Sequence, residues 1–355
     1  MLLSDRPRNL GDIVDTKHVP IVVEVVAPDR YVERRGTSRE ITEEEISAYV
    51  TALAKSLSFP HNAIAVADLW EDQPIDPKHP RHYVPPEKTK VDNLLFLRIL
   101  RKTTQESFPI LYKVGVHSTQ EELVSWVTDS HREGINTIMI VGGDRTGIDY
   151  PGLHPGEFAR LIHALHSESY IGSPMIQTRY AEFTRMAVKQ KNGVQFVRSQ
   201  LSFNAQPFIE VADAYLNHCE ANGIQPIAIG AYFSPIVSRR SPGKDGDRTN
   251  ITLIRNLIRE GEHPERWRLF PKGVEAELRA SGNVTKKSVA LIIREMERIL
   301  EYWERRRRAF PLLIGFEFLS RYPHQILQAS EAMQEIIEHL PKELRVEEEL
   351  QSPQA

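Results

Sequence analysis

The run Ile21-Val22-Val23-Glu24-Val25-Val26 is apolar at every position except Glu24. A continuous apolar run of this length is typical of a parallel strand that is buried on both faces of its sheet. Similar runs recur along the chain, at residues 63–67, 110–116, 137–141, 170–176, 195–199, 226–231 and 312–318. The sequence therefore predicts eight parallel strands.

Amphipathic stretches with helix start and stop signals lie between these runs. Thr119 and Glu122 have the spacing of a capping box. Asn192-Gly193 and Asn222-Gly223 are stop signals, because glycine readily adopts the left-handed conformation that ends a helix. Eight β-then-α units predict an α/β protein of the (β/α)8 class, a TIM barrel. A doubly wound open sheet is the main alternative, and the lack of a glycine-rich dinucleotide fingerprint disfavours it.

One domain is predicted for residues 1–344, because α/β barrels of this size commonly form a single domain. Residues 238–308, between the seventh and eighth strands, contain a polar loop and three helical stretches, at 251–260, 273–280 and 285–308. We expect this segment to be an extended helical insertion near the active-site face. Residues 345–355 form a polar tail that is expected to fray.

The composition argues against several classes of function. Lys plus Arg is 45 and Asp plus Glu is 48, so a net charge of −3 gives no general attraction to nucleic acid or anionic membranes. No stretch approaches the roughly 20 apolar residues that span a bilayer. The single cysteine, Cys219, excludes an internal disulfide and a cysteine metal cluster, and the histidine spacing predicts no metal site. A cytoplasmic protein is the simplest prediction, and a homo-oligomer is compatible with it.

Two carboxylates inside the apolar runs are candidates for chemistry, because function in such a barrel lies at the C-terminal ends of the strands. Burial of Glu24 should raise the pKa of its carboxyl group and suit it to general acid catalysis. A structural ion pair with a buried Arg or Lys is the alternative. Glu317 lies in the last run, which neighbours the first in a closed barrel. The two carboxylates therefore either share one end of the lumen or point to opposite faces.

Further candidates follow other runs. Gly142-Gly143-Asp144 ends the fourth run, where two glycines let the backbone approach a flat ligand and Asp144 would stand at the barrel mouth. A tight turn closed by the aspartate is the alternative. Asp68 ends the second run in the same way. Gln200 follows the sixth run, where a neutral amide can read the donor and acceptor edge of a heterocycle.

In their order along the chain, these residues resemble the methylenetetrahydrofolate reductases, which are flavin enzymes on a (β/α)8 barrel. The resemblance runs from about residue 19 to 231 and returns at 312–323. It implies that Glu24 is the catalytic acid and that Asp144, in Gly-Asp, lies beside the flavin and the pterin. Gln200, in Ser-Gln-Leu-Ser-Phe, resembles the glutamine of the family's Thr-Gln-Phe-Phe-Phe, which contacts flavin and folate.

Other matches concern the cofactor and the substrate. Phe158-Ala159 resembles a Tyr-Ala pair that touches the flavin, and Lys189 resembles a lysine near the cofactor phosphates. Residues 318–322, Phe-Leu-Ser-Arg-Tyr, resemble the family's Tyr-Thr-Leu-Asn-Arg near the last strand. Cofactor contacts are accordingly expected at Gly142, Gly143, Asp144, Phe158, Ala159, Arg185, Lys189 and Gln200, and substrate contacts at Gln200, Glu317 and Arg321.

The resemblance implies an oxidoreductase that moves hydride from NAD(P)H through FAD to the one-carbon unit of a folate. Glu24 would supply the proton that opens the folate's imidazolidine ring to the reactive iminium. Asp144 would bind the donor edge of the pterin.

Departures from the family pattern weaken the expected flavin site. Gly142 replaces an arginine, Ala67 a threonine and Tyr112 a histidine, and residues 175–180 lack the family's Tyr-Pro-x-x-His-Pro stretch. A flavin-independent tetrahydrofolate-dependent methyltransferase or demethylase on the same barrel is therefore the second hypothesis. A non-catalytic pterin-binding relative is the third. If FAD binds, we expect the helix with Arg179, Arg185 and Lys189 to hold it.

Overall fold

The computed structural model describes residues 9–34, 37–57, 59–68, 83, 89–102, 107–143, 148–237, 268–318 and 323–346. Eight parallel strands form a closed barrel. They are β1 (Ile21–Val25), β4 (Ala63–Val66), β5 (Phe108–Val114), β6 (Thr137–Val141), β7 (Tyr170–Met175), β8 (Phe196–Ser199), β9 (Ala228–Phe233) and β10 (Leu312–Glu317). The first strand, β1, pairs in parallel with both β4 and β10, which closes the sheet. The predicted TIM barrel is confirmed, and the open sheet is excluded.

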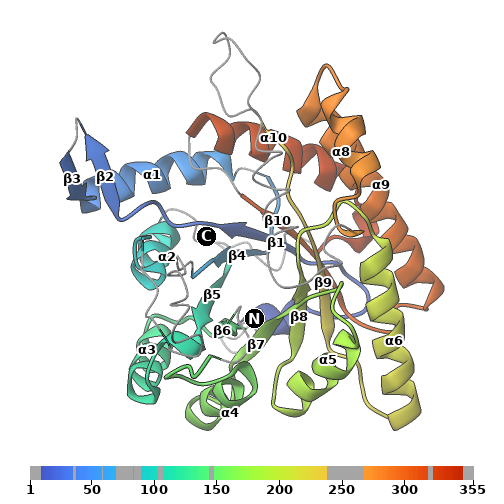
Figure 1. Ribbon diagram of the computed structural model, residues 1–355, viewed down its shortest axis with the longest axis horizontal. Helices are drawn as coiled ribbons and strands as arrows, with labels where there is room; N and C mark the ends of the chain where they lie inside the picture. The colour runs from blue at the N-terminus through green and yellow to red at the C-terminus, as the bar shows by residue number, and fades with distance from the viewer. Residues whose placement is uncertain are drawn as a thin grey trace, which may run out of the picture.

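Helices surround the barrel as a ring (Figure 1). They are α1 (Glu43–Ser56), α2 (Asn93–Arg101), α3 (Gln120–Arg132), α4 (Pro155–Leu165), α5 (Glu182–Lys191), α6 (Gln206–Asn222), α9 (Val284–Arg305) and α10 (Pro323–Glu338). The predicted capping box of Thr119 and Glu122 is present at the start of α3. Gly193 and Gly223 follow α5 and α6 with φ of 98° and 64°, as expected for helix stops. None of the helices in these ranges is long and apolar enough to cross a membrane.

The helix α9 lies between α6 and α10, so it takes the place of the barrel helix between β9 and β10 (Figure 1). Within the stretch 238–308, residues from Val284 onward therefore belong to the eightfold repeat. The shorter α8 (Lys272–Arg279) packs outside the ring against α9. The predicted helix at 251–260 lies outside the described residues.

A hairpin of β2 (Tyr31–Arg34) and β3 (Thr37–Glu40) projects beside α1 and was not predicted from the sequence (Figure 1). Its strands are polar, so they lack the apolar run by which the barrel strands are recognised. The helices α2 and α10 were also not predicted.

The N-terminal end of the barrel is covered by a short 3-10 helix, η2 (Leu10–Ile13). Leu10 is fully buried, and its N–H donates to Thr137 Oγ1 at the start of β6 (3.4 Å). A Cβ atom on Gly11 would lie 2.6 Å from the ring of Tyr170, so the helix sits directly against the first residue of β7. A ligand would therefore approach the lumen from the C-terminal end of the strands.

Glycines in the strands make room for aromatic rings inside the barrel. A Cβ atom on Gly172 would lie 2.2 Å from the ring of Phe196, and one on Gly315 would lie 2.4 Å from the ring of Tyr232. Gly315 pairs with Tyr232 in the ladder between β10 and β9. A side chain at Gly315 would therefore displace Tyr232, because a packed interior has no spare volume.

We expect Gly315→Ala to destabilise the protein by about 1–3 kcal/mol, the usual cost of overpacking a core. Gly273→Ala is the matched control, because a Cβ atom there meets nothing within 4 Å. The control should be neutral or stabilising by up to about 1 kcal/mol, since Gly273 lies in α8. Urea unfolding of both variants measures the difference, and equal stabilities would contradict the prediction.

Candidate active site

Three charged side chains meet in the lumen near the C-terminal ends of the strands. They are Glu24 of β1, Arg198 of β8 and Glu317 of β10. Glu24 and Glu317 are paired in the ladder between β1 and β10. Arg198 Nη1 donates to Glu317 Oε1, and Arg198 Nη2 lies 3.4 Å from Glu24 Oε1. Because β8 is not a neighbour of β1 or β10, these contacts cross the lumen. The two carboxylates thus share one end of the barrel.

Two tyrosines complete this charged cluster. The hydroxyl of Tyr112, on β5, donates to Glu24 Oε2 (2.5 Å). The guanidinium carbon of Arg198 lies 5.3 Å from the ring centre of Tyr112 and 5.0 Å from that of Tyr232, on β9. These distances are those of cation–π contacts, which favour a buried guanidinium. Arg198 is therefore held on two sides by aromatic rings and on two others by carboxylates.

Burial sets the chemistry of Glu24. Its side chain is 6% exposed, against 16% for Arg198 and 11% for Glu317, so the cluster is enclosed but borders solvent. Burial raises the pKa of Glu24 to about 7, although Arg198 and the Tyr112 hydroxyl oppose the rise; the charge of Glu317 adds to it. A carboxyl group with this pKa can donate or accept a proton at neutral pH.

The charge balance fits this protonation state. One guanidinium offsets one carboxylate, so the cluster is neutral when Glu24 carries a proton and Glu317 is ionised. The sequence left two interpretations of Glu24 open, a carboxyl group whose pKa is raised by burial and an ion pair with a buried basic residue, and the structure contains features of both. Its carboxyl pKa is raised by burial, and it also contacts a buried arginine.

Gln200 lies two residues after Arg198, just past the end of β8. Its backbone N–H donates to Gln177 Oε1 and its carbonyl accepts from Gln177 Nε2, both at 2.9 Å. Its own Oε1 is buried and accepts no hydrogen bond within the described ranges. Arg198 Nε is also buried, and it donates no hydrogen bond within these ranges. Polar atoms at this end of the barrel are thus left available for a ligand or water.

Two predicted site residues, Asp144 and Arg321, lie outside the described residues. Asp68 lies just after β4, where its Oδ2 accepts from the Val114 N–H of the neighbouring strand (3.1 Å). It therefore ties the ends of two strands together.

The two predicted glycines follow the fourth barrel strand, β6, and each has a ring close to its Cα atom. A Cβ atom on Gly143 would lie 2.4 Å from the ring of Tyr150, and one on Gly142 would lie 3.1 Å from Pro155. The Tyr150 ring packs edge-on against Tyr83 and His117. These three rings come from segments that are distant in the chain, so no local sequence pattern connects them. Tyr150 therefore lies on the side of Gly143 where a side chain would be, while Gly143 itself remains exposed.

The pair expected to touch a flavin lies in the core. Phe158 and Ala159 are fully buried on the inner face of α4. The Phe158 ring lies 6.5 Å from that of Trp126, and a Cβ atom on Gly115 would come within 2.9 Å of it. Fully buried side chains cannot contact a bound cofactor in this arrangement.

Two of the three basic residues expected at the flavin phosphates, Arg179 and Lys189, contact the buried carboxylate of Glu182. Lys189 donates to the carbonyl of Pro174, and its ammonium lies 3.5 Å from Glu182 Oε1. Arg179 Nη1 lies 3.5 Å from the other oxygen of Glu182. Burial lowers the pKa of Lys189, and Glu182 opposes this change. Arg185 is exposed on the same helix. The described residues therefore do not form the FAD cradle that the resemblance implies.

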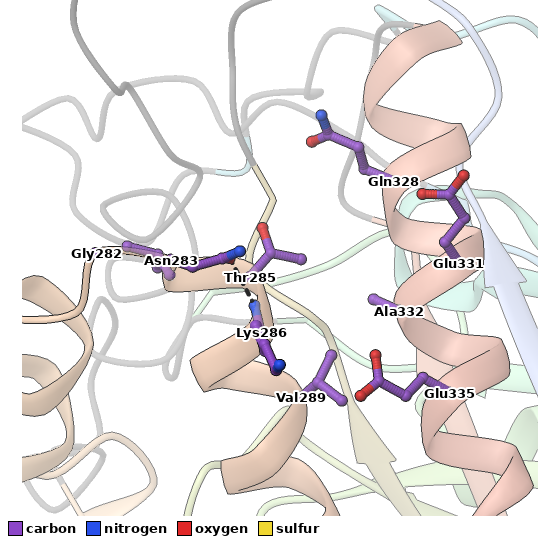
Figure 2. Close-up of a pocket in the computed structure, with 10 residues that line it drawn as sticks. Gly282, Asn283, Thr285, Lys286, Val289, Gln328, Glu331, Ala332 and Glu335 are labelled. Atoms are coloured by element: carbon purple, nitrogen blue, oxygen red, sulfur yellow. Dashed lines mark hydrogen bonds between the residues drawn. The ribbon is translucent and has the colours of Figure 1, made fainter. Parts of the chain in front are cut away.

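A separate groove of about 590 Å³ lies outside the barrel, between the start of α9 and α10. Figure 2 shows Lys286 on α9 and Glu331 and Glu335 on α10 along its two walls. The Asn283 side chain accepts from the Lys286 N–H (3.0 Å) and so caps α9 at the edge of the groove. No member of the charged cluster lines this groove, so it is not the candidate active site.

Comparisons with known proteins support the fold. No protein-family model matches the chain, and no curated protein matches its sequence. An uncharacterised protein from Clostridium thermocellum, whose structure is described as binding two copies of 5-methyl-5,6,7,8-tetrahydrofolic acid, matches with a TM-score of 0.65. It is 13% identical, and the match covers 91% of this chain and 97% of that one. The likeness shows that the two proteins share the barrel fold.

The spore cortex-lytic enzyme SleL of Bacillus megaterium QM B1551 also matches, with a TM-score of 0.40 and 8% identity over 90% of this chain and 74% of that one. A likeness at this level carries no argument about function.

We expect stability to fall as the pH rises through about 7. The unfolded chain loses the Glu24 proton near the ordinary pKa of 4.5, whereas the folded protein retains it up to about 7. The stabilisation by protonated Glu24 is therefore fully present below about pH 4.5 and is lost above 7, and it amounts to roughly 3 kcal/mol.

Urea unfolding at pH 5 and pH 8 checks this pH dependence. Glu24→Gln should remove the part of the pH dependence that comes from Glu24, because glutamine does not titrate. Glu335→Gln, at an exposed position on α10, should keep the pH dependence of the unchanged protein. Identical dependence in the unchanged protein and Glu24→Gln would show that Glu24 is not the titrating group.

Proposed function

We propose that the chain binds a reduced folate at the C-terminal end of the barrel and performs one-carbon chemistry there, with Glu24 as the proton donor. The observation that carries the proposal is a buried carboxyl group in the lumen whose pKa is raised to about 7. The Clostridium thermocellum protein of the same fold, described as binding 5-methyltetrahydrofolate, supports the choice of ligand.

The groups at this end of the barrel match the parts of a reduced pterin. A pterin ring is flat and carries hydrogen-bond donors along its pyrimidine edge. Gln200 Oε1 is an acceptor without a donor in the described part of the chain. The rings of Tyr150, Tyr83 and His117 pack against one another and are partly exposed, so they offer aromatic surface to a flat ligand. The one-carbon unit is attached at ring nitrogens, which need a proton when the unit is released.

Glu24 can supply that proton. When a methyl group leaves N5 for a nucleophilic acceptor, a proton from Glu24 to N5 makes neutral tetrahydrofolate the leaving group. When a methylene group bridges N5 and N10, protonation of one nitrogen opens the bridge to an electrophilic iminium. In both cases Glu24 becomes a carboxylate, and Arg198 Nη2 at 3.4 Å and the Tyr112 hydroxyl stabilise its charge. This is the proton transfer expected of a general acid.

The choice between the two enzyme hypotheses depends on flavin. The resemblance implies an FAD-dependent reductase that takes hydride from NAD(P)H. The full burial of Phe158 and Ala159 favours the flavin-independent methyltransferase or demethylase instead. We therefore propose folate chemistry without a resident flavin.

Calorimetric titration with 5-methyltetrahydrofolate tests the binding, and we expect Glu24→Gln to bind within a few-fold of the unchanged protein. Turnover is followed by mass spectrometry as conversion among methyl-, methylene- and unsubstituted tetrahydrofolate, with thiol or amine acceptors and with NAD(P)H. Glu24→Gln should lower turnover by roughly 10²-fold or more. Glu335→Gln is the control and should match the unchanged protein. Failure to bind any of the three folates would refute the proposed ligand, and an unchanged rate would remove Glu24 from the mechanism.

Titration with FAD tests the flavin-free assignment. We expect no change in flavin fluorescence or visible absorbance, because the described residues present no cradle for the isoalloxazine ring. A yellow protein that loses FAD on Arg185→Ala or Lys189→Ala would instead support the FAD-dependent reductase.

A further inference from the structure

A second constellation lies at the opposite end of the barrel from Glu24. His131 is in the last turn of α3, His166 directly follows α4, and Glu168 lies in the turn that leads into β7. The helices α3 and α4 pack side by side in the ring, with their C-terminal ends at the start of the strands (Figure 1). The two imidazole rings are stacked, with centres 3.6 Å apart and planes inclined by 7°. The sequence predicted no metal site, because 35 residues separate the two histidines.

The three side chains bring their ligand atoms close together. The Nδ1 atoms of His131 and His166 lie 3.6 and 3.8 Å from the same oxygen, Glu168 Oε1. All three ligand atoms lie within 4.8 Å of one another. In a tetrahedral zinc site with bonds of about 2.0–2.1 Å, ligand atoms are about 3.3 Å apart. The separations are close to those of a zinc site, but the planes of the two stacked rings are parallel, so their in-plane nitrogen lone pairs do not meet. One ring must turn about its side-chain torsions before both nitrogens can bind the same ion.

Neighbouring groups hold the ligands in place. The hydroxyl of Ser169 lies 2.8 Å from His131 Nε2, and Ser169 is 1% exposed. When this hydroxyl accepts from Nε2–H, the lone pair of the ring is on Nδ1, which faces Glu168. Metal-binding histidines commonly make such an outer hydrogen bond. The backbone carbonyl of Glu168 also accepts from Asn9 Nδ2 (3.3 Å), which anchors the turn.

The electrostatic surroundings favour a cation. Two helices end at this place, and the C-terminal end of a helix carries partial negative charge. Arg132, next to His131, is paired with Asp129 at 2.6 Å.

We propose that His131, His166 and Glu168 bind a divalent transition-metal ion of the zinc class. Two imidazoles and one carboxylate are a donor set that zinc accepts, with a fourth position left for water. The ion would fasten the end of α3 to the turn before β7. The site is independent of the proposed folate chemistry, because it lies at the other end of the barrel.

Calorimetric titration of the EDTA-treated, dialysed protein with zinc chloride tests the proposal. We expect one zinc ion per chain and a rise in Tm on binding. His166→Ala should weaken binding by more than roughly 100-fold, which exceeds the 10–100-fold loss typical of removing an outer contact. Ser169→Ala should give a loss within that smaller range, because Ser169 positions His131 without binding the ion. His339→Ala, at an exposed histidine that directly follows α10, should bind zinc like the unchanged protein.

Two further measurements keep the proposal testable if His166→Ala unfolds. Glu168→Gln changes a side chain that is 59% exposed, so it should fold normally and still lose affinity. Cobalt(II) in place of zinc should give the intense visible bands of a four-coordinate site, and Glu168→Gln should change them. Absence of zinc binding would overturn the proposal, as would affinity unchanged in both His166→Ala and Glu168→Gln.

Discussion

Closure of the sheet between β1 and β10 places Glu24 directly beside Glu317, and the single guanidinium of Arg198 must offset both carboxylates. Two ionised carboxylates and one cation in an enclosed lumen would leave a net negative charge, which burial penalises. A proton on Glu24 removes that charge. The raised carboxyl pKa is therefore a consequence of barrel closure. Arg198 is in turn held between the rings of Tyr112 and Tyr232. The Tyr232 ring fits there because Gly315 has no side chain.

The two ends of the barrel are built for different tasks. At the C-terminal end the lumen reaches solvent, and buried polar atoms of Arg198 and Gln200 have no hydrogen-bond partner among the described residues. At the N-terminal end, η2 covers the lumen and the stacked histidines lie outside it. A ligand can therefore act on Glu24 at one end while an ion binds at the other, without direct contact between the two sites.

The departures from the reductase pattern have physical consequences in this structure. Tyr112 stands where the resemblance places a histidine, and its hydroxyl donates a hydrogen bond to Glu24. Unlike a histidine, it cannot carry a positive charge near neutral pH. Burial raises the pKa of this phenol further, so it stays a neutral donor. Gly143 retains its small size, and the Tyr150 ring lies where a side chain at this position would be. Such changes keep a carboxyl group in the lumen and alter the residues that surround it.

The sequence by itself determined the eight strands, most of the helices and the burial of Glu24, because apolar runs, capping residues and a carboxylate within an apolar run are local signals. Glu317 was recognised in the same way, but its direction stayed open, since only the register of β1 against β10 decides it. Arg198, Tyr112 and Tyr232 were not predicted as partners of Glu24, because they lie on strands that are distant in the chain and meet only across the closed lumen. The same reason applies to His131 and His166, which two helix ends bring together. Contacts across a barrel depend on strand number, register and closure, and no local pattern of residues contains that information.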